Sequence, residues 1–363
     1  MKSTFKKTPV TIITGFLGSG KSTLLMHLLT ESKSRRIAVI VNEFGEIGID
    51  GNLIKSTCQC DESSLVELKN GCVCCTVQEE FLPTMKKLLQ EEVPFDHIVV
   101  ETSGLALPKP LLKAVNWPDL KPLLTIDSVI TVVDADGLAT GEICDRDAVQ
   151  KQREADSNLD HETPIEELFE DQLSCADLVV LTKCDLISAE RLQTVYASIR
   201  ERLRPNVKVI EVERGRLDPD IALGVGAGAE DDLNRRHSKH DEHHHHHHDD
   251  HDHDHDHHAH HHHHHDHHHD DSIRTILLDM GTVEDPSHLV EQLRELCRRF
   301  EIYRIKGFVS VQGKAMRLVL QGVGMRFETY FDRPWAADEE RKTHLVVIGH
   351  ELYEEALKAH LDN

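Results

Sequence analysis

The chain has 363 residues, of which 39% are hydrophobic, and its formal net charge is −23. This length allows two domains, and the apolar content is that of a globular protein. The large excess of negative charge argues against nucleic acid as a partner of the whole chain. No window reaches the apolar length that a membrane-spanning helix needs, so we expect no membrane partner either.

The cysteine content indicates the compartment. Nine cysteines occur in a chain whose N-terminus shows no export signal, because the short apolar run at 10–16 leads into a glycine-rich loop and not into a small-residue cleavage site. In such a chain, cysteines are expected to be reduced thiols or metal ligands rather than disulfides. We therefore expect a cytoplasmic protein.

Residues 1–222 alternate apolar, β-branched runs with amphipathic stretches. The amphipathic patterns at 79–92 and 188–203 predict helices. Continuous apolar strands separated by helices are typical of a parallel sheet that is covered on both faces. The sequence therefore predicts an α/β domain with a doubly wound, mostly parallel sheet. Its expected strands are 10–16, 36–44, 97–104, 128–135, 178–185 and 208–213.

Two further regions follow this domain. Residues 223–271 begin with a Gly- and Ala-rich stretch and continue with 22 histidines interleaved with Asp. Such a composition cannot bury enough apolar surface to offset the entropy of ordering, so we expect a disordered linker. Residues 272–363 are expected to form a small α+β domain. Its predicted strands are 273–280, 303–311, 314–323, 325–331 and 344–350, and its predicted helices are 287–300 and 351–361.

The stretch GFLGSGKS fits the phosphate-binding pattern Gly-x4-Gly-Lys-Ser, and it lies between an expected strand and an expected helix. The glycines let backbone N–H groups converge on phosphate oxygens, and the helix N-terminus adds partial positive charge. Lys21 is expected to reach the β- and γ-phosphates, and Ser22 to ligate Mg²⁺. This context favours a P-loop NTPase over a chance glycine-rich turn. The expected nucleotide contacts are Gly15, Gly18, Ser19, Gly20, Lys21, Ser22 and Thr23.

Thr182, Lys183 and Asp185, in the stretch TKCD at the end of an apolar strand, resemble the [Asn/Thr]-Lys-x-Asp motif of GTP-binding proteins. A carboxylate at Asp185 can accept hydrogen bonds from guanine N1 and its 2-amino group, a donor pair that adenine lacks. The alternative is that Asp185 only caps the following helix. Together with the phosphate-binding loop upstream, the motif favours GTP over ATP.

Glu101 and Gly104, in the stretch ETSG, resemble the switch segment of GTPases. Glu101 stands where an Mg²⁺-associated Asp often lies, and Gly104 would let the backbone approach a γ-phosphate. No Gln follows to orient an attacking water, so we expect slow intrinsic hydrolysis. The residues expected to act in catalysis are Lys21, Glu101 and Gly104.

The stretch NGCVCC places Cys72, Cys74 and Cys75 close together in the chain. Thiolates with this spacing can bind one soft or borderline divalent ion, with two of the three as the favoured direct ligands. A redox dithiol and small buried apolar side chains are the alternatives. The occurrence of these three cysteines in a chain with a phosphate-binding loop favours a metal site whose state depends on the nucleotide.

Further candidate ligands surround this cluster. Cys58 and Cys60 form a second pair that either assists metal capture or lies in a loop. Glu46, close to Glu43, is a candidate oxygen ligand or Mg²⁺ partner, and a solvated turn is the alternative. The His/Asp tract at 237–271 can bind Zn²⁺, Ni²⁺, Co²⁺ or Cu²⁺ at many weak sites, as a reservoir would. A solubilising linker with incidental metal affinity is its alternative interpretation.

Together, GFLGSGKST, NGCVCC, ETSG, TKCD and the C-terminal module resemble the CobW-type metallochaperone GTPase family over essentially the whole chain. The blocks at 101–118 and 159–173 and the His/Asp tract before the last domain are most similar to the cobalamin-biosynthesis branch. The resemblance implies GTP and Mg²⁺ at the P-loop, and a metal site that Cys72, Cys74 and Cys75 complete in the GTP state. It also implies delivery of Co²⁺ to the chelatase machinery that inserts cobalt into the corrin ring, with release on GTP hydrolysis.

Other functions stay open at this point. Relatives that serve zinc share the cysteine cluster, so a zinc-allocating GTPase with Zn²⁺ as its cargo is the first alternative. A His-rich metal-storage protein is the second. A nucleotide kinase is the third, although TKCD and the cysteine cluster argue against it. Sequence does not choose the receiving protein, the role of the C-terminal module or the oligomeric state, and an oligomer is possible.

Overall fold

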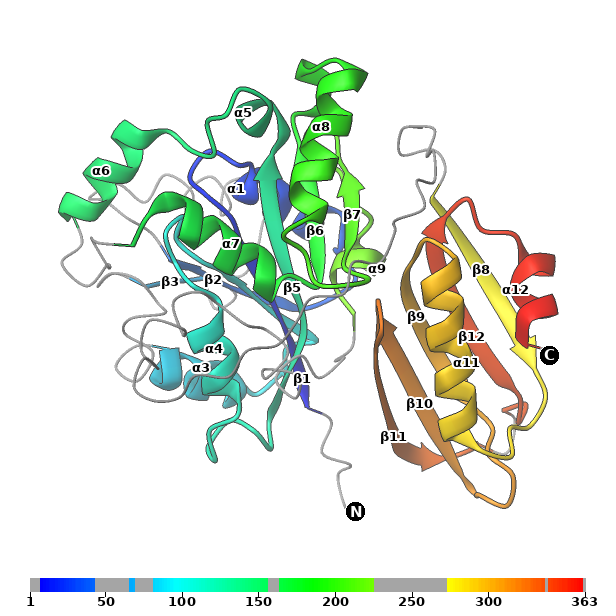
Figure 1. Cartoon of the computed structure of the whole chain (residues 1–363). Helices are drawn as coiled ribbons and strands as arrows, with labels where there is room; N and C mark the ends of the chain where they lie inside the picture. The colour runs from blue at the N-terminus through cyan, green and yellow to red at the C-terminus, as the bar shows by residue number, and fades with distance from the viewer. Residues whose placement is uncertain are drawn as a thin grey trace, which may run out of the picture.

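Two sheets of different kinds organise the chain, and they lie side by side in Figure 1. The computed structural model describes residues 7–42, 65–68, 81–155, 163–224, 273–336 and 339–361. The first sheet has seven strands and the second has five. None of the helices in these ranges has both the length and the hydropathy of a membrane-spanning helix.

The first sheet has the order β3-β2-β4-β1-β5-β6-β7, with parallel pairing throughout. Its strands are β1 (Thr8–Thr14), β2 (Ile37–Asn42), β3 (Leu65–Leu68), β4 (His97–Glu101), β5 (Leu124–Asp134), β6 (Leu178–Thr182) and β7 (Lys208–Glu211). The connecting helices are α1 (Lys21–Glu31), α3 (Leu82–Leu89), α4 (Lys109–Val115), α5 (Ala135–Ala139), α6 (Arg146–Ala155), α7 (Ile165–Cys175), the 3-10 turn η3 (Cys184–Leu186), α8 (Ala189–Arg200) and α9 (Pro219–Ala222).

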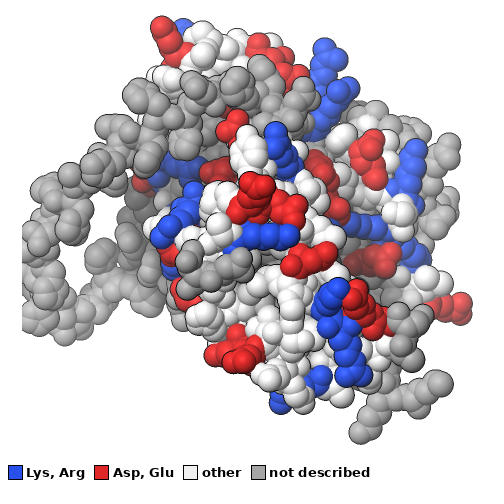
Figure 2. Space-filling model, turned by 90° about the vertical axis from the view of Figure 1, so that its right-hand side faces the viewer, with Lys and Arg blue, Asp and Glu red and all other residues white. Residues whose placement is uncertain are grey.

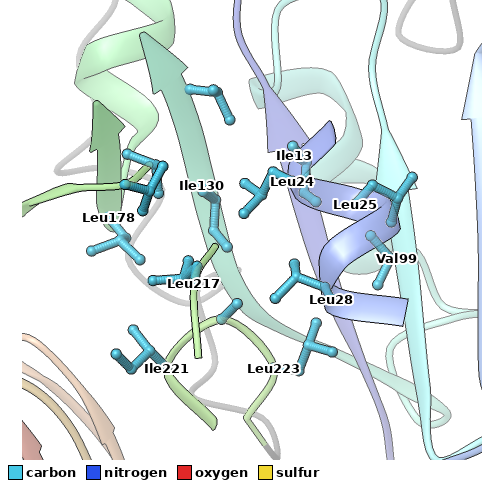
Figure 3. Packing of buried hydrophobic residues seen from close by; sticks show 14 of the residues in the cluster. Ile13, Leu24, Leu25, Leu28, Val99, Ile130, Leu178, Leu217, Ile221 and Leu223 are labelled. Carbon is cyan, nitrogen blue, oxygen red and sulfur yellow. The ribbon is translucent and has the colours of Figure 1, made fainter. Parts of the chain in front are cut away.

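Helices cover both faces of this sheet because its strands are apolar on both sides. Ile12 packs with α3 and α4 on one face, and Ile13 packs with α1 and α9 on the other. Figure 3 shows Leu24 and Leu28 of α1 lying against the sheet beside Ile130. The doubly wound parallel sheet predicted from the sequence is confirmed.

The second sheet has the order β11-β10-β9-β12-β8 and is antiparallel. One of its faces is covered by two helices, whose leucines pack with Leu345 and Val347 of the sheet. The predicted α+β domain is therefore confirmed. Its elements are β8 (Ile273–Met280), α11 (Pro286–Arg299), β9 (Ile302–Val309), β10 (Met316–Val323), β11 (Arg326–Pro334), β12 (Thr343–His350) and α12 (Glu354–Leu361).

Acidic and basic side chains are intermixed on the face of the molecule that Figure 2 shows. Helix α11 carries four such pairs along its exposed side: Arg294–Glu291 at 3.0 Å, Arg298–Glu291 at 3.6 Å, Arg298–Glu295 at 2.7 Å and Arg299–Glu295 at 3.2 Å. Exposed pairs of this kind contribute little to stability individually. They do neutralise the surface locally, so this face carries no field of a single sign among its described residues.

A buried carboxylate, Asp127, joins the two domains. Arg304 of β9 donates from Nη2 to Asp127 Oδ2 at 3.0 Å, and the Gly224 N–H donates to the same oxygen at 2.6 Å. The side chains of Arg304 and Asp127 are 2% and 1% exposed. A Cβ on Gly224 would lie 1.4 Å from Arg304 Nη1, so any other residue there would displace the guanidinium. Strand β5, the end of the first domain and strand β9 therefore meet at one carboxylate.

The backbone of β5 is irregular where it presents this carboxylate. Val10 pairs with Ile126 and Thr11 pairs with Ser128, which leaves Asp127 as an extra residue in β5. Bulges of this kind redirect a side chain and bend the strand. They also interrupt the apolar alternation, and β5 accordingly begins at Leu124 and not at residue 128 as predicted.

Further contacts between the domains surround the Asp127 pair. Tyr303 and Ile348 of the second domain belong to the apolar cluster of the first domain that contains α1. Burial of apolar surface and paired charges together fix this interface. The polar contacts include Arg326 Nη1 with Asp177 at 2.6 Å, Arg326 Nη2 with the Asp127 carbonyl at 2.6 Å, Lys208 with Glu301 at 3.3 Å and Lys306 with Asp220 at 2.9 Å.

His97, the first residue of β4, lies beside the interface and is neutral. Its Nε2 is 2.8 Å from Thr11 Oγ1, and the side chain is fully enclosed. Burial lowers the pKa of His97 to about 4, and this outweighs the attraction of Asp127, which raises the pKa. The nearby charge of Arg304 lowers the pKa further.

Removing one member of the buried pair is expected to cost more stability than neutralising both. Arg304→Met leaves the Asp127 charge buried without its counter-ion, and should lower the free energy of unfolding by about 3–5 kcal/mol. Adding Asp127→Asn removes that charge and keeps an oxygen for the Gly224 N–H. The double variant should therefore be the more stable of the two in urea unfolding. Arg298→Met, at an exposed pair, is the control, and a double variant no more stable than Arg304→Met contradicts the account.

The pKa of His97 predicts an acid-dependent loss of stability. Between pH 6.5 and about 4 the unfolded chain binds a proton at His97 and the folded chain does not. The free energy of unfolding should therefore fall as pH decreases through this window, by about 3 kcal/mol from this residue. His97→Gln keeps a polar partner for Thr11 and lacks that proton, so it should lose less stability over the same range. Equal pH dependence of variant and wild type, both carrying every other His, would refute this.

Candidate functional site

The loop between β1 and α1 has a backbone that depends on glycine. Gly15, Gly18 and Gly20 have φ angles of 136°, 79° and 98°. A Cβ on Gly15 would lie 2.2 Å from the Val132 carbonyl oxygen, whereas one on Gly18 would meet nothing within 4 Å. The loop is thus packed against β5 at its start and open at Gly18. This arrangement presents backbone N–H groups to an anion at the start of α1.

Lys21 is folded back over this loop. Its Nζ donates to the Gly15 carbonyl at 2.7 Å and to the Phe16 carbonyl at 3.0 Å, and its side chain is buried. Ser19 is also buried, and its N–H donates to Phe16 O at 3.2 Å. The ammonium group therefore lies inside the loop, where it can also donate a hydrogen bond to a bound phosphate.

Ser22 and Glu101 meet at the carboxyl end of the sheet. Ser22 Oγ, in the first turn of α1, donates to Glu101 Oε1 at 3.3 Å. The contact follows from sheet register, because Glu101 at the end of β4 pairs with Ile13 near the end of β1. A hydroxyl and a buried carboxylate form the hard oxygen donor set that Mg²⁺ requires. Thr23, the next residue of α1, is exposed.

Gly104 touches the phosphate-binding loop. A Cβ on Gly104 would lie 2.6 Å from the Leu17 backbone nitrogen, so the two backbones are in direct contact. Thr102 ties the same segment to β1, with its N–H on Ile13 O at 2.9 Å and its Oγ1 on Thr14 Oγ1 at 3.0 Å. The structure thus brings Glu101 and Gly104 together with the loop, and their role as a switch segment stays a prediction.

In the TKCD stretch, Thr182 contacts the phosphate-binding loop and Asp185 lies at the surface. Thr182 Oγ1 donates to Ser19 O at 2.7 Å, so this side chain holds the phosphate-binding loop. Lys183 adopts a left-handed backbone with φ of 56°, and its Nζ contacts the Asp134 carboxylate. The Asp185 side chain lies in η3 and is exposed, hence accessible to a base. Thr182 therefore reaches the nucleotide site through the phosphate-binding loop, and its predicted part in nucleotide binding stays a prediction.

Two residues that the sequence did not single out belong to this group. Asp134 ends β5, caps α5 by accepting from the Gly137 N–H at 3.1 Å, and contacts Lys183. Because Asp134 follows an apolar run in the sequence, it could have been predicted as a site residue. Gln172 lies within α7 and reaches the segment that contains Gly104. An isolated Gln inside an amphipathic helix gives no sequence signal of that kind.

Apart from Ser22 and Glu101, the candidate metal ligands fall outside the described residues. They are Cys72, Cys74 and Cys75, the pair Cys58 and Cys60, Glu43 and Glu46, and the His/Asp tract at 237–271. Within the described ranges, no group of three or more His, Cys, Asp or Glu side chains has the geometry to hold a metal ion.

The isolated cysteines of the described ranges form no cluster of metal ligands. Cys144, Cys175, Cys184 and Cys297 are free thiols. Burial raises the pKa of Cys184 to about 12, and it raises that of Cys297 to about 12 as well. Because metal ions bind the thiolate form, protonated thiols of this kind are poor ligands.

Two family models match the chain. "CobW/HypB/UreG, nucleotide-binding domain" matches residues 9–211, and "Cobalamin synthesis protein cobW C-terminal domain" matches residues 273–363. A Pseudomonas aeruginosa protein named "Zinc chaperone CobW" is 49% identical over 360 residues, with 98% of this chain and 90% of that protein covered. A Sinorhizobium sp protein of the same name is 44% identical, with 97% and 96% covered. Among solved structures, Zn(II)-bound YjiA GTPase from E. coli has 23% identity and a TM-score of 0.38, with 98% of each chain covered.

Glu101→Gln tests the oxygen donor set. The change keeps the shape of the side chain and removes the negative charge that would attract a divalent cation beside Ser22. GTP hydrolysis should fall by about 10- to 100-fold and require a higher Mg²⁺ concentration. Glu31→Gln, at the exposed end of α1, is the matched control. Unchanged hydrolysis and Mg²⁺ dependence in Glu101→Gln would remove Glu101 from the site.

Proposed function

Because the chain belongs to the CobW family of GTPase metallochaperones, we propose that it binds a divalent transition metal in its Mg–GTP state and releases the metal to an acceptor after hydrolysis. The reaction is hydrolysis of the bound GTP. Mg²⁺, when it is bound, neutralises negative charge on the phosphates. Phosphate contacts are assigned to residues 15–23, and recognition of guanine to Asp185. Lys21, Glu101 and Gly104 act on the γ-phosphate.

The observation that carries the proposal is the 3.3 Å contact between Ser22 and Glu101 at the carboxyl edge of the sheet. Strands β2 and β3 end at the same edge, since Val41 pairs with Glu101 and Asn42 pairs with Leu68. The chain leaves these two strands toward residue 46 and toward the NGCVCC motif respectively. A change at Glu101 between the GTP and GDP states therefore acts at the strands from which both candidate metal segments begin.

The metal site itself is assigned to thiolates of Cys72, Cys74 and Cys75, with Glu46 as a candidate oxygen ligand. This donor set suits a borderline divalent ion such as Zn²⁺ or Co²⁺. It binds Zn²⁺ more tightly than Co²⁺ by the intrinsic order of affinities, so cobalt selectivity would need restricted zinc availability.

Zinc is the cargo that we favour. Two relatives that cover nearly the whole chain are named zinc chaperones, and intrinsic affinity agrees with those names. Cobalt is the second candidate, and one observation favours it: the C-terminal family model that matches residues 273–363 carries the name of cobalamin synthesis. If cobalt is the cargo, the acceptor is the chelatase machinery that inserts cobalt into the corrin ring.

The test is a metal competition experiment on the full chain. Zn²⁺ and Co²⁺ are offered together at equal free concentrations, set by a chelator strong enough to keep the weak His/Asp sites empty. Bound metal is measured with GTPγS and Mg²⁺, with GDP and Mg²⁺, and without nucleotide. We expect Zn²⁺ to be retained only in the GTPγS state, and Cys74→Ser to abolish this retention.

Cys144→Ser is the control, because Cys144 is an isolated thiol in the described part of the first domain. Retention of Co²⁺ in place of Zn²⁺, with the same nucleotide dependence, would keep the gating and change the cargo. Equal metal binding in all three nucleotide states would overturn the proposed function and favour metal storage.

A further inference from the structure

Gln172, in the middle of α7, is completely buried, although its side chain is an amide. Its Nε2 donates to the Gly104 carbonyl at 3.0 Å and to the Ala106 carbonyl at 3.3 Å. The backbone carbonyl of Gln172 accepts from Thr131 Oγ1 at 3.0 Å, which anchors this turn of α7 to β5. One side chain thus connects a helix fixed on the sheet to the segment that follows β4.

That segment needs the amide, because it is buried without regular structure. Residues 102–106 are all buried, and they belong to neither a helix nor a strand. Buried carbonyl groups need a hydrogen-bond partner from the backbone, a side chain or water, and in this segment the Ala106 N–H supplies one for Ser103 at 3.1 Å. The two N–H groups of the Gln172 amide satisfy the carbonyls of Gly104 and Ala106 together. Losing them would leave both acceptors unpaired in the interior.

The other end of the segment is also held, and Gly104 lies between the two anchors. Thr102 fixes the start of the segment to β1 through the Ile13 carbonyl. Gly104 is pressed against the Leu17 backbone of the phosphate-binding loop, where a Cβ would approach to 2.6 Å. Rotation of the peptide after Gly104 is therefore limited by Thr102 on one side and by Gln172 on the other.

We propose that Gln172 is a positioning residue for GTP hydrolysis, which fixes the Gly104 peptide against the phosphate-binding loop so that its backbone contacts the γ-phosphate. This inference rests on the proposed GTPase function. Gln172 is fully buried and its side chain donates to the Gly104 carbonyl, so it acts through the backbone of Gly104. Its effect is specific to the triphosphate, because GDP has no γ-phosphate for Gly104 to contact.

The chemistry of the contact predicts a graded response to substitution. The Oε1 atom of Gln172 has no hydrogen-bond partner among the described residues, so the side chain acts here only as a donor. Gln172→Leu has a similar size and no donor. Gln172→Glu has one donor when its carboxyl is protonated and none when it is ionised. Burial against two carbonyl oxygens raises the pKa of the introduced carboxyl, so its donor is lost as pH rises.

The experiment measures kcat for GTP hydrolysis and the affinities for GTPγS and GDP on the full chain with Mg²⁺. Gln172→Leu should lower kcat by about 10- to 100-fold and weaken GTPγS binding, because a displaced backbone no longer meets the γ-phosphate. The affinity for GDP should stay unchanged. Gln193→Leu, an exposed site on α8, is the control and should match wild type.

Gln172→Glu separates positioning from simple structural support, and it serves also where the leucine variant does not fold. Its kcat relative to wild type should decrease as pH rises, while its GDP affinity stays constant. Unchanged kcat in Gln172→Leu, or a parallel loss of GDP and GTPγS affinity, would overturn the inference. If wild type does not hydrolyse GTP, the proposed function fails. The inference then depends on nucleotide affinities alone. It stands if Gln172→Leu lowers the affinity for GTPγS and not that for GDP, and any other result overturns it.

Discussion

The parallel pairing of β1 with β4 and β5 is the constraint on which the nucleotide site depends. Parallel strands bring their carboxyl ends to one edge, where ligands of α/β sheets bind. Ile13 pairs with Glu101, and Thr14 pairs with Thr131, so the loop after β1 begins beside the ends of both neighbours. The Ser22–Glu101 contact and the packing of Gly104 on Leu17 are consequences of this register.

The second domain packs near the same three strands, at positions away from that edge. Thr11, His97 and Asp127 lie within or at the start of β1, β4 and β5, and Asp127 is bonded to Arg304. A charge pair this deeply buried is costly to desolvate, and its value lies in the geometry that it imposes. Here it sets the C-terminal sheet against β5 without occupying the edge where the phosphate-binding loop lies.

Sequence reasoning succeeded where local chemistry repeats a known pattern. The glycine spacing of residues 15–20 predicted the loop, and the apolar strands that end at Glu101 and Thr182 bring the ETSG and TKCD stretches to one edge of the sheet. Its failures have a common cause, which is long-range pairing. Asp127 looks like a strand breaker in the sequence, yet Arg304 far along the chain makes it a core residue. Gln172 likewise has its partners in a distant segment.

Coupling between nucleotide state and metal affinity is the central claim. Such coupling is reciprocal, so a metal that binds only the GTP state must strengthen GTP binding by the same factor. The most direct measurement is the affinity of the full chain for GTPγS and for GDP, each with Mg²⁺, with and without chelator-buffered Zn²⁺. The account predicts that Zn²⁺ tightens GTPγS binding and leaves GDP binding unchanged. Identical GTPγS affinity with and without Zn²⁺ would contradict it.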